Sequence, residues 1–307
     1  MLAPRYCGST RTGFRQTEQY MGGELTLGAA VAASGAAVSP NMGAATPSAA
    51  LALLLGAFNI RLGLWVPTPR RPSWMLPQMW LWPYYLLREA LSQTNDLGSH
   101  CYLTDGGHFD NSGLYSLVER GCRYIILADN GADPEPCFAD LGEAIRRCRI
   151  DFRAEFELDT RAFRPAGDEP VAAHVVFGRI KYDPEHLRSL GWSHMIREPF
   201  GYLVWIKPVV LPGDAADVRQ YRLENSAFPQ QTTADQWFGE SQFESYRKLG
   251  ELSAHAAFAE AASTTTLRAR PPLTTRVVAE FFAALERRQA ADKDGNWVDR
   301  LRTALKV

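Results

Sequence analysis

The chain contains 307 residues, of which 46% are hydrophobic, 22% charged and 11% aromatic. This is the composition of an ordinary globular protein, and it excludes the disordered, collagen-like and disulfide-scaffold classes. The 33 lysines and arginines balance 34 aspartates and glutamates to a net charge of -1. That balance argues against a broad nucleic-acid-binding face.

The region 25–60 carries no charged residue, which raises the question of a transmembrane span. It is, however, rich in alanine, glycine and serine, and Pro40 and Pro47 interrupt it. Weak hydrophobicity and internal helix breakers favour two buried helices, over 25–38 and 46–55, joined by a turn. The arginines upstream lie among glycines and threonines, without the apolar core of a signal peptide.

The region 64–87 concentrates aromatic residues and prolines. It contains half of the eight tryptophans, and its five prolines exclude a regular helix before Pro83. After that proline, the pattern predicts a short helix over 84–91.

The region 100–149 alternates strand and helix patterns. Strands are predicted over 101–104 and 124–128, and the helices over 114–120 and 138–147 follow them. This order is typical of a βαβ unit in a parallel sheet. Because residues 124–128 form a continuous apolar run, we expect that strand to be buried on both faces.

Beyond residue 151 the pattern changes to strands with hairpin-style links. Strands are predicted over 154–158, 172–181 and 201–210, as an antiparallel extension of the sheet. Helices are predicted over 235–249, 275–288 and 296–305. The predicted fold class is therefore α/β.

Two aspartates follow predicted strands at their carboxyl ends, where α/β proteins bind ligands. Asp105 precedes Gly106 and Gly107, which permit a sharp turn and leave its carboxylate uncovered. Asp105 is therefore a candidate catalytic residue, although it could instead only cap the turn through an Asx hydrogen bond. For Asp129, which precedes an Asn-Gly pair, the turn interpretation is favoured.

The sequence carries no motif for a metal or a nucleotide cofactor. Asp105, His108 and Asp110 lie near one another, but no further ligand cluster completes a metal site. A G-x-x-x-x-G-K-[ST] loop and a G-x-G-x-x-G turn after a strand are both absent, so we expect no cofactor. Five cysteines without metal-ligand spacing predict small buried thiols in a reducing compartment.

A hydrolase that uses an aspartate as its base also needs a nucleophile. The usual carrier is Gly-x-Ser-x-Gly at a strand-to-helix turn, and no serine of this chain lies in that motif. Ser193 and Ser241 have the leading glycine but lack the trailing one. No nucleophile is therefore identified by motif.

Several ordered blocks resemble the patatin-like phospholipase family, in particular its large bacterial branch that is similar to cytosolic phospholipase A2. The first block, residues 104–115, reads Thr-Asp-Gly-Gly-His-Phe-Asp-Asn-Ser-Gly-Leu-Tyr. Further blocks agree in order at 33–43, 59–63, 124–133, 233–238 and 242–247. The resemblance covers roughly residues 1–250.

Members of this family hydrolyse acyl esters of lipids with a serine–aspartate dyad. The resemblance implies phospholipase A or lysophospholipase activity in which Asp105, in Asp-Gly-Gly, takes the serine proton directly, without a cofactor or a metal. It assigns support of the site loop to Gly106, Gly107, His108 and Asn111. The family's serine lies upstream of the blocks found here, so the resemblance implies the C-terminal part of a longer enzyme that is inactive as the isolated chain.

The resemblance also implies a patatin-like three-layer sandwich with a mainly parallel central sheet, without the N-terminal strands and the nucleophile elbow. We expect residues 1–210 to form the C-terminal portion of the acyl hydrolase domain, and residues 211–307 a mostly helical extension that packs on it. Loss of the first strands would uncover an apolar sheet edge, so we expect the isolated chain to self-associate.

The expected partner is a phospholipid or another acyl-ester lipid and no nucleic acid, with an upstream segment or a partner chain supplying the nucleophile. Trp74, Trp80, Trp82 and Tyr84 either contact a membrane interface or form a buried aromatic cover over the sheet. We expect a cytoplasmic location, with peripheral contact at the inner membrane surface under the first interpretation. The alternative function is a non-catalytic remnant that binds a lipid or a protein partner.

Overall fold

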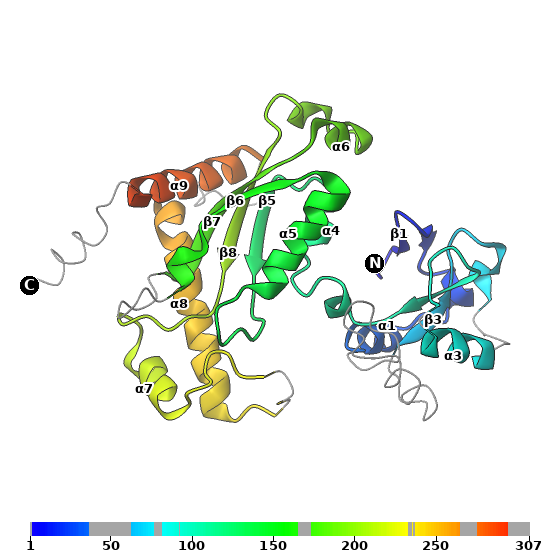
Figure 1. Ribbon diagram of the computed structural model, residues 1–307, viewed down its shortest axis with the longest axis horizontal. Coiled ribbons are helices and arrows are strands. Elements are labelled where there is room, and N and C mark those ends of the chain that lie inside the picture. Colours follow the sequence, from blue (N-terminus) through cyan, green and yellow to red (C-terminus); the bar gives the residue numbers. More distant parts are fainter. Residues whose placement is uncertain are drawn as a thin grey trace, which may run out of the picture. The chain divides into compact units, whose positions relative to one another are not determined.

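A computed structural model describes residues 2–36, 63–76, 82–91, 93–164, 173–232, 235, 237–264 and 275–293 (Figure 1). The chain forms two compact units, Met1–Asn111 and Ser112–Val307, each with its own hydrophobic core. The helices predicted over 46–55 and 296–305 lie outside the described residues, as does Trp80.

The first unit contains two short antiparallel ribbons, one formed by β1 and β2 and the other by β3 and β4. Its elements are β1 (Tyr6–Ser9), β2 (Gly13–Gln16), α1 (Leu27–Ser34), β3 (Leu64–Pro67), α3 (Trp82–Ala90) and β4 (His100–Leu103). Short 3-10 helices lie at Tyr20–Gly23, Pro72–Met75 and Gly106–His108. The predicted strand at 101–104 and the predicted helix at 84–91 are thus confirmed as β4 and α3.

Sulfur and aromatic side chains form the core of the first unit, where Cys7 and Cys101 pack with Tyr20. Burial raises the pKa of both thiols, so they stay protonated at neutral pH. Cys148 is buried in the second unit, as predicted. The prediction is wrong for Cys137, which is exposed in the loop before α5.

α1 differs from the buried helix predicted to begin at residue 25. Thr26 caps it by accepting a hydrogen bond from the Ala29 N–H at 3.1 Å. Leu27 and Val31, four residues apart on one face, are 81% and 63% exposed. Small residues, mostly alanine, occupy the other positions of α1. The two large apolar side chains of this helix therefore point away from the core.

The second unit is built around a mixed four-stranded sheet in the order β5-β8-β7-β6. β5 and β8 are parallel, whereas β6, β7 and β8 pair antiparallel, which confirms the predicted antiparallel extension. The strands are β5 (Tyr124–Ala128), β6 (Glu155–Leu158), β7 (Val175–Lys181) and β8 (Phe200–Ile206). The helices are α4 (Leu114–Glu119), α5 (Ala139–Phe152), α6 (Pro184–Ser189), α7 (Ala216–Glu224), α8 (Glu240–Thr264) and α9 (Thr275–Lys293).

Helices cover both faces of this sheet (Figure 1). On one face, α4 and α5 pack over Ile125, Leu127 and Trp205. On the other, α8 and α9 pack over Val175 and Val204. Alternate residues of β5 and β8 enter opposite cores because side chains alternate along a strand.

The predicted parallel βαβ unit is wrong in the described structure. β4 pairs antiparallel with β3, with Trp65 opposite Tyr102, while β5 belongs to the sheet of the second unit. The sequence pattern located both strands, but an apolar run does not encode which neighbour it pairs with. The 64–67 segment, dense in aromatic residues and proline, was not recognised as a strand and provides the partner of β4.

β5 is buried on one face only, contrary to the prediction from its apolar run. Ile125 and Leu127 are 1% and 3% exposed beneath α5, but Ile126 on the opposite face is 51% exposed. On that face Phe282 of α9 contacts Tyr124, with 4.6 Å between ring centroids, and the cover does not extend over Ile126. β5 is also an edge strand of the described sheet.

The helices beyond residue 210 belong to the second unit, so the predicted boundary between 210 and 211 falls inside it. α7 packs on α8 through a small buried cluster that includes Val218, Phe228 and Leu249. α8 and α9 both extend past their predicted ends. Within the described ranges, no helix has both the length and the apolar character needed to cross a membrane.

Replacing Phe163 with alanine tests the core of the second unit. This side chain is 1% exposed and packs edge-on against Trp205, with ring centroids 4.7 Å apart. We expect the free energy of unfolding in urea to fall by about 3–5 kcal/mol, the usual cost of such a cavity. Phe243→Ala is the control: 62% of Phe243 is exposed, and such surface changes stay within about 0.5 kcal/mol. Equal losses for the two variants would contradict this packing.

Candidate functional site

Asp105 lies two residues after the end of β4 and caps the 3-10 helix at Gly106–His108. Its Oδ1 accepts a hydrogen bond from the Gly107 N–H at 2.8 Å, which is the Asx turn that the sequence left open as an alternative. Among the described residues, this is the one hydrogen bond that the carboxylate accepts. Asp105 is half-buried, and its second oxygen accepts no hydrogen bond from a described residue.

The two glycines after Asp105 have different roles. A Cβ atom on Gly107 would lie 3.0 Å from Asn111 Oδ1 and 3.3 Å from Asp105 Oδ1. Glycine at this position therefore lets the Asp105 carboxylate and the Asn111 amide approach the same turn. A Cβ atom on Gly106 would meet nothing within 4 Å, so no contact requires glycine there.

His108 lies at the end of the same turn. Its Nδ1 is 3.1 Å from Thr104 Oγ1, and that hydroxyl donates to the Ala36 carbonyl at 3.1 Å. The turn thus brings together Asp105, Gly107, His108 and Asn111, all of them candidates from the sequence. Across the described ranges, no group of three or more His, Cys, Asp and Glu side chains is placed to bind a metal ion.

The aromatic residues considered for a membrane interface differ in their surroundings. Trp74 packs against the core of the first unit, and the Arg15 guanidinium lies 4.8 Å from its ring centroid. Tyr84 is 52% exposed on α3. Trp82 is the first residue of α3, and its side chain lies outside the described structure.

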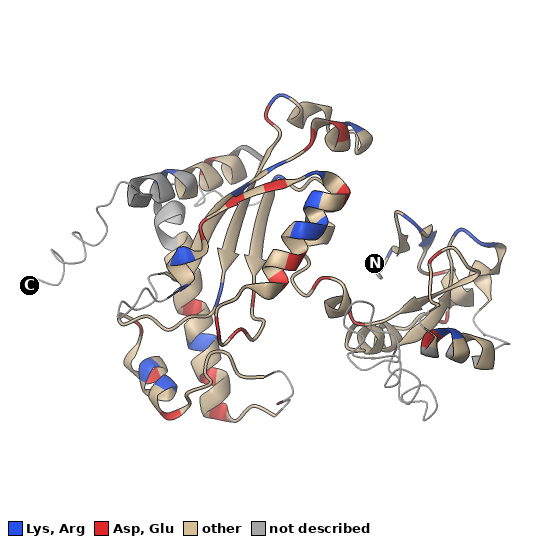
Figure 2. Ribbon diagram, viewed as in Figure 1, with Lys and Arg blue, Asp and Glu red and all other residues tan. Residues whose placement is uncertain are grey.

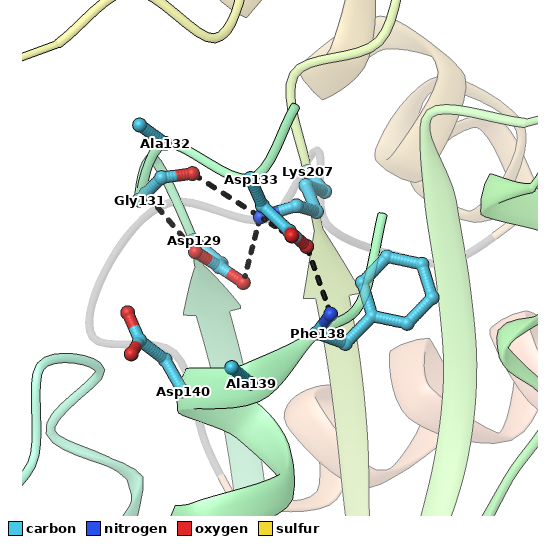
Figure 3. Close-up of a pocket in the computed structure, with 8 residues that line it drawn as sticks. All are labelled: Asp129, Gly131, Ala132, Asp133, Phe138, Ala139, Asp140 and Lys207. Atoms are coloured by element: carbon cyan, nitrogen blue, oxygen red, sulfur yellow. Dashed lines mark hydrogen bonds and ion pairs between the residues drawn. The ribbon is translucent and has the colours of Figure 1, made fainter. Parts of the chain in front are cut away.

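Asp129, at the end of β5, has a buried environment (Figure 3). Its Oδ1 accepts a hydrogen bond from the Gly131 N–H at 3.1 Å, so the predicted turn is confirmed. Its Oδ2 accepts from Lys207 Nζ and Trp205 Nε1, both at 3.2 Å. Asp129 is 9% exposed and Lys207 is 3% exposed. The sequence does not reveal this ion pair, because a lone lysine 78 residues from Asp129 belongs to no motif.

Lys207 organises the loop between β5 and α5. It follows β8, which is parallel to β5, so Lys207 and Asp129 meet at the carboxyl ends of adjacent strands. The ammonium also donates to the Gly131 carbonyl at 3.3 Å and lies 4.0 Å from Asp133 Oδ2. Asp133 accepts the N–H groups of Cys137 and Phe138, at 3.0 and 2.9 Å, just before α5.

A cavity of about 50 Å³ lies beside this ion pair, with room for about one or two water molecules. It is lined by Asp129, Gly131, Ala132, Asp133, Phe138, Ala139, Asp140 and Lys207 (Figure 3). The Lys207 ammonium has three acceptors around it, and the Asp129 carboxylate accepts from three donors. This arrangement stabilises a loop rather than presenting an uncommitted group for chemistry.

A second buried cluster joins Ser253, His174 and Asp214, which lie far apart in the sequence. His174 Nε2 is 2.9 Å from Asp214 Oδ1, and Ser253 Oγ is 3.4 Å from His174 Nδ1. The residue types are those of a hydrolase triad, yet their exposure is 3%, 4% and 9%, respectively. The serine hydroxyl donates to the Leu249 carbonyl at 2.8 Å within α8. Substrate cannot reach this serine, so the cluster acts as a polar link between α8 and the loops that flank β7 and β8.

Comparison with known proteins adds no assignment to these sites. No protein-family model, curated protein or solved structure matches the chain. The candidate site therefore rests on the geometry of the described residues and on the sequence resemblance.

Replacing Lys207 with methionine tests the structural role of the ion pair. The variant keeps most of the side-chain volume but leaves the Asp129 carboxylate buried without its cation. We expect the free energy of unfolding to fall by about 3–5 kcal/mol. In a double-mutant cycle, adding Asp129→Asn should recover part of that loss. Strictly additive losses would show that the two groups do not stabilise each other.

Proposed function

We propose that this chain is the part of a patatin-like lipid acyl hydrolase that carries the general base, Asp105. The nucleophilic serine then comes from an upstream segment or from a partner chain. The observation that carries the proposal is the hydrogen bonding of the half-buried Asp105 carboxylate: the Gly107 N–H fixes one oxygen, and the other accepts no hydrogen bond from a described residue. The sequence resemblance adds the reaction class.

A carboxylate in this state suits direct proton transfer. A general base must be held in a fixed orientation and must keep a lone pair within reach of the proton it takes. The Gly107 N–H provides the first requirement and leaves the second oxygen for a serine hydroxyl. Asn111 and His108 lie on the same turn, and we assign them the support of the loop.

In the proposed reaction, the serine Oγ bonds to the acyl carbon while its proton moves to Asp105. The bond between the acyl carbon and the alcohol oxygen then breaks, and Asp105 returns the proton to the departing alcohol. Water attacks the acyl-serine in the second half, giving a proton to Asp105, which passes it to the serine Oγ as the fatty acid leaves. This sequence needs neither a metal nor a cofactor.

The buried surroundings of Asp129 favour Asp105 as the base. Lys207 and Trp205 both donate to Asp129 Oδ2, and Gly131 donates to Oδ1. Both oxygens of this carboxylate accept hydrogen bonds, and the residue is only 9% exposed, so it is poorly placed to take a proton from a substrate. We therefore assign Asp129 to the fold and Asp105 to the chemistry.

The architecture supports the same proposal at a coarser level. Helices pack on both faces of the mixed sheet, as a three-layer sandwich requires. β5 is an edge strand of the described sheet, so on one side its backbone pairs with no other described strand. We propose that the family's N-terminal strands and nucleophile elbow come from outside this chain.

Asp105→Asn is the most direct test of the base, in the full-length protein that contains a Gly-x-Ser-x-Gly segment. Asparagine can still accept the Gly107 hydrogen bond but cannot take a proton, so we expect kcat to fall by about 10²- to 10⁴-fold on a short-chain ester. Asp159→Asn is a matched control: Asp159 also caps a 3-10 helix, accepting the Arg161 N–H at 3.1 Å. Undiminished activity of Asp105→Asn would overturn the assignment of Asp105 as the base, whereas the non-catalytic alternative predicts that the unsubstituted protein is inactive as well.

The glycine pair offers a second test, of positioning. Gly107→Ala places a methyl group against Asn111 and Asp105, so one of them must shift. We expect kcat to fall about tenfold, because small displacements of a catalytic group are costly. Gly106→Ala meets open space and serves as the control. Equal activity of the two variants would show that the approach of Asn111 to Asp105 does not matter for the reaction.

A further inference from the structure

Thr104 lies between β4 and Asp105, and its side chain contacts two other parts of the first unit. The hydroxyl oxygen is 3.1 Å from the carbonyl oxygen of Ala36, two residues beyond α1, and 3.1 Å from Nδ1 of His108. A carbonyl oxygen can only accept a hydrogen bond, so the one hydroxyl proton of Thr104 points to Ala36. The contact with His108 therefore uses a lone pair of the Thr104 oxygen.

These two contacts determine which nitrogen of His108 carries the proton. Because Thr104 has no second proton to donate, its hydrogen bond with His108 requires an N–H group at Nδ1. In the neutral ring, the other nitrogen, Nε2, then has a lone pair and no proton. Free histidine in water favours the opposite form, with the proton on Nε2. The protein thus imposes the Nδ1–H tautomer through Thr104.

His108 belongs to the same turn as the Asp105 carboxylate. The backbone N–H of His108 donates to the Asp105 carbonyl at 3.2 Å, which closes the 3-10 turn. Residues three apart lie on the same side of such a turn. The two residues between them, Gly106 and Gly107, have no side chains. A proton on Nε2 of His108 would therefore provide a donor on the side of the turn to which Asp105 belongs.

Few other side chains of this segment can donate to Asp105. Residues 101–111 contain no lysine or arginine, and Figure 2 shows no basic residue on the chain that leaves β4. His108 and Asn111 are the two side chains of the segment that have N–H groups. The second oxygen of Asp105 nevertheless accepts no hydrogen bond from a described residue. The commitment of the His108 proton to Thr104 explains why the imidazole does not donate to it.

We propose that Thr104 is a positioning residue for the proposed hydrolysis and acts by keeping the His108 proton on Nδ1. A hydrogen bond from an Nε2–H group would stabilise the charged form of Asp105 and make it a weaker base. With the proton held at Thr104, the second oxygen of Asp105 keeps its lone pairs for the serine hydroxyl. The inference rests on the proposed function, because it assigns Thr104 a role in the reaction of that base.

The tautomer of His108 can be measured in the 307-residue chain itself, without enzymatic activity. Nitrogen–proton correlation spectra at about pH 8, where histidine is ordinarily neutral, distinguish protonated from unprotonated ring nitrogens. The spectrum of His108→Gln identifies the His108 signals. We expect the proton on Nδ1 in the unsubstituted protein and in Thr104→Ser. In Thr104→Val, which keeps the shape of threonine without its hydroxyl, we expect a shift to the Nε2–H form.

Kinetics of the full-length protein that contains the Gly-x-Ser-x-Gly segment provide the second readout. For Thr104→Val we expect kcat on a soluble short-chain ester to fall about tenfold, and the acid limb of the pH profile to move to lower pH. Thr104→Ser should keep the activity. In a His108→Leu background, Thr104→Val should have no further effect, because no imidazole proton is left to redirect.

Thr17→Val is the matched control for both measurements. Thr17 also lies in the first unit, and its hydroxyl donates to the carbonyl of Ala3 at 2.7 Å. It forms no hydrogen bond with a histidine among the described residues. Its loss should leave both the tautomer of His108 and the rate of hydrolysis unchanged.

The outcomes separate this inference from the proposed function. The inference is overturned if neutral His108 carries its proton on Nε2 in the unsubstituted protein, a result that needs no folded Thr104 variant. It is also overturned if Thr104→Val keeps the tautomer, or slows hydrolysis equally with and without His108. These results leave Asp105 as the base. If the unsubstituted full-length protein is inactive, or if Asp105→Asn stays active, the proposed function fails and the role of Thr104 in hydrolysis fails with it, whatever the tautomer.

Discussion

The second unit depends on how it accommodates a buried positive charge. Lys207 is 3% exposed, and an ammonium removed from water is costly unless acceptors surround it. Asp129 supplies the countercharge, while the Gly131 carbonyl and the Asp133 carboxylate lie nearby. These contacts fix the loop that leaves β5 and, through Asp133, the first residues before α5. The parallel strand pair brings the two charges together.

This ion pair also determines which aspartate is available for chemistry. Asp105 and Asp129 look alike in sequence, since each follows a strand and precedes a glycine-containing turn, and each forms an Asx hydrogen bond. Their remaining oxygens differ: that of Asp129 accepts from Lys207 and Trp205, and that of Asp105 accepts no hydrogen bond from a described residue. The contrast explains why the proposed function takes Asp105 and not Asp129 as the base. Ser253 is a second example of a residue whose type suggests catalysis but whose burial excludes it. Its hydrogen-bonded cluster with His174 and Asp214 is buried and links parts of the fold.

Local features could be predicted from the sequence, and non-local ones could not. The apolar run 124–128 located β5 to the residue, and the Asp-Gly-Gly turn anticipated the Asx geometry of Asp105. The predicted partner of the strand at 101–104 was wrong, because the strand propensity of these residues does not reveal that residues 64–67 lie beside them. Lys207 was missed because its partner lies 78 residues away.

We propose that Asp105 serves as the base for a serine encoded outside this chain. Sequencing the DNA immediately upstream of the Met1 codon tests it most directly. The claim predicts an in-frame stretch that encodes Gly-x-Ser-x-Gly and is continuous with this reading frame. An in-frame stop codon directly before Met1, with no such motif in a neighbouring coding sequence, would contradict it and leave Asp105 a base without a nucleophile.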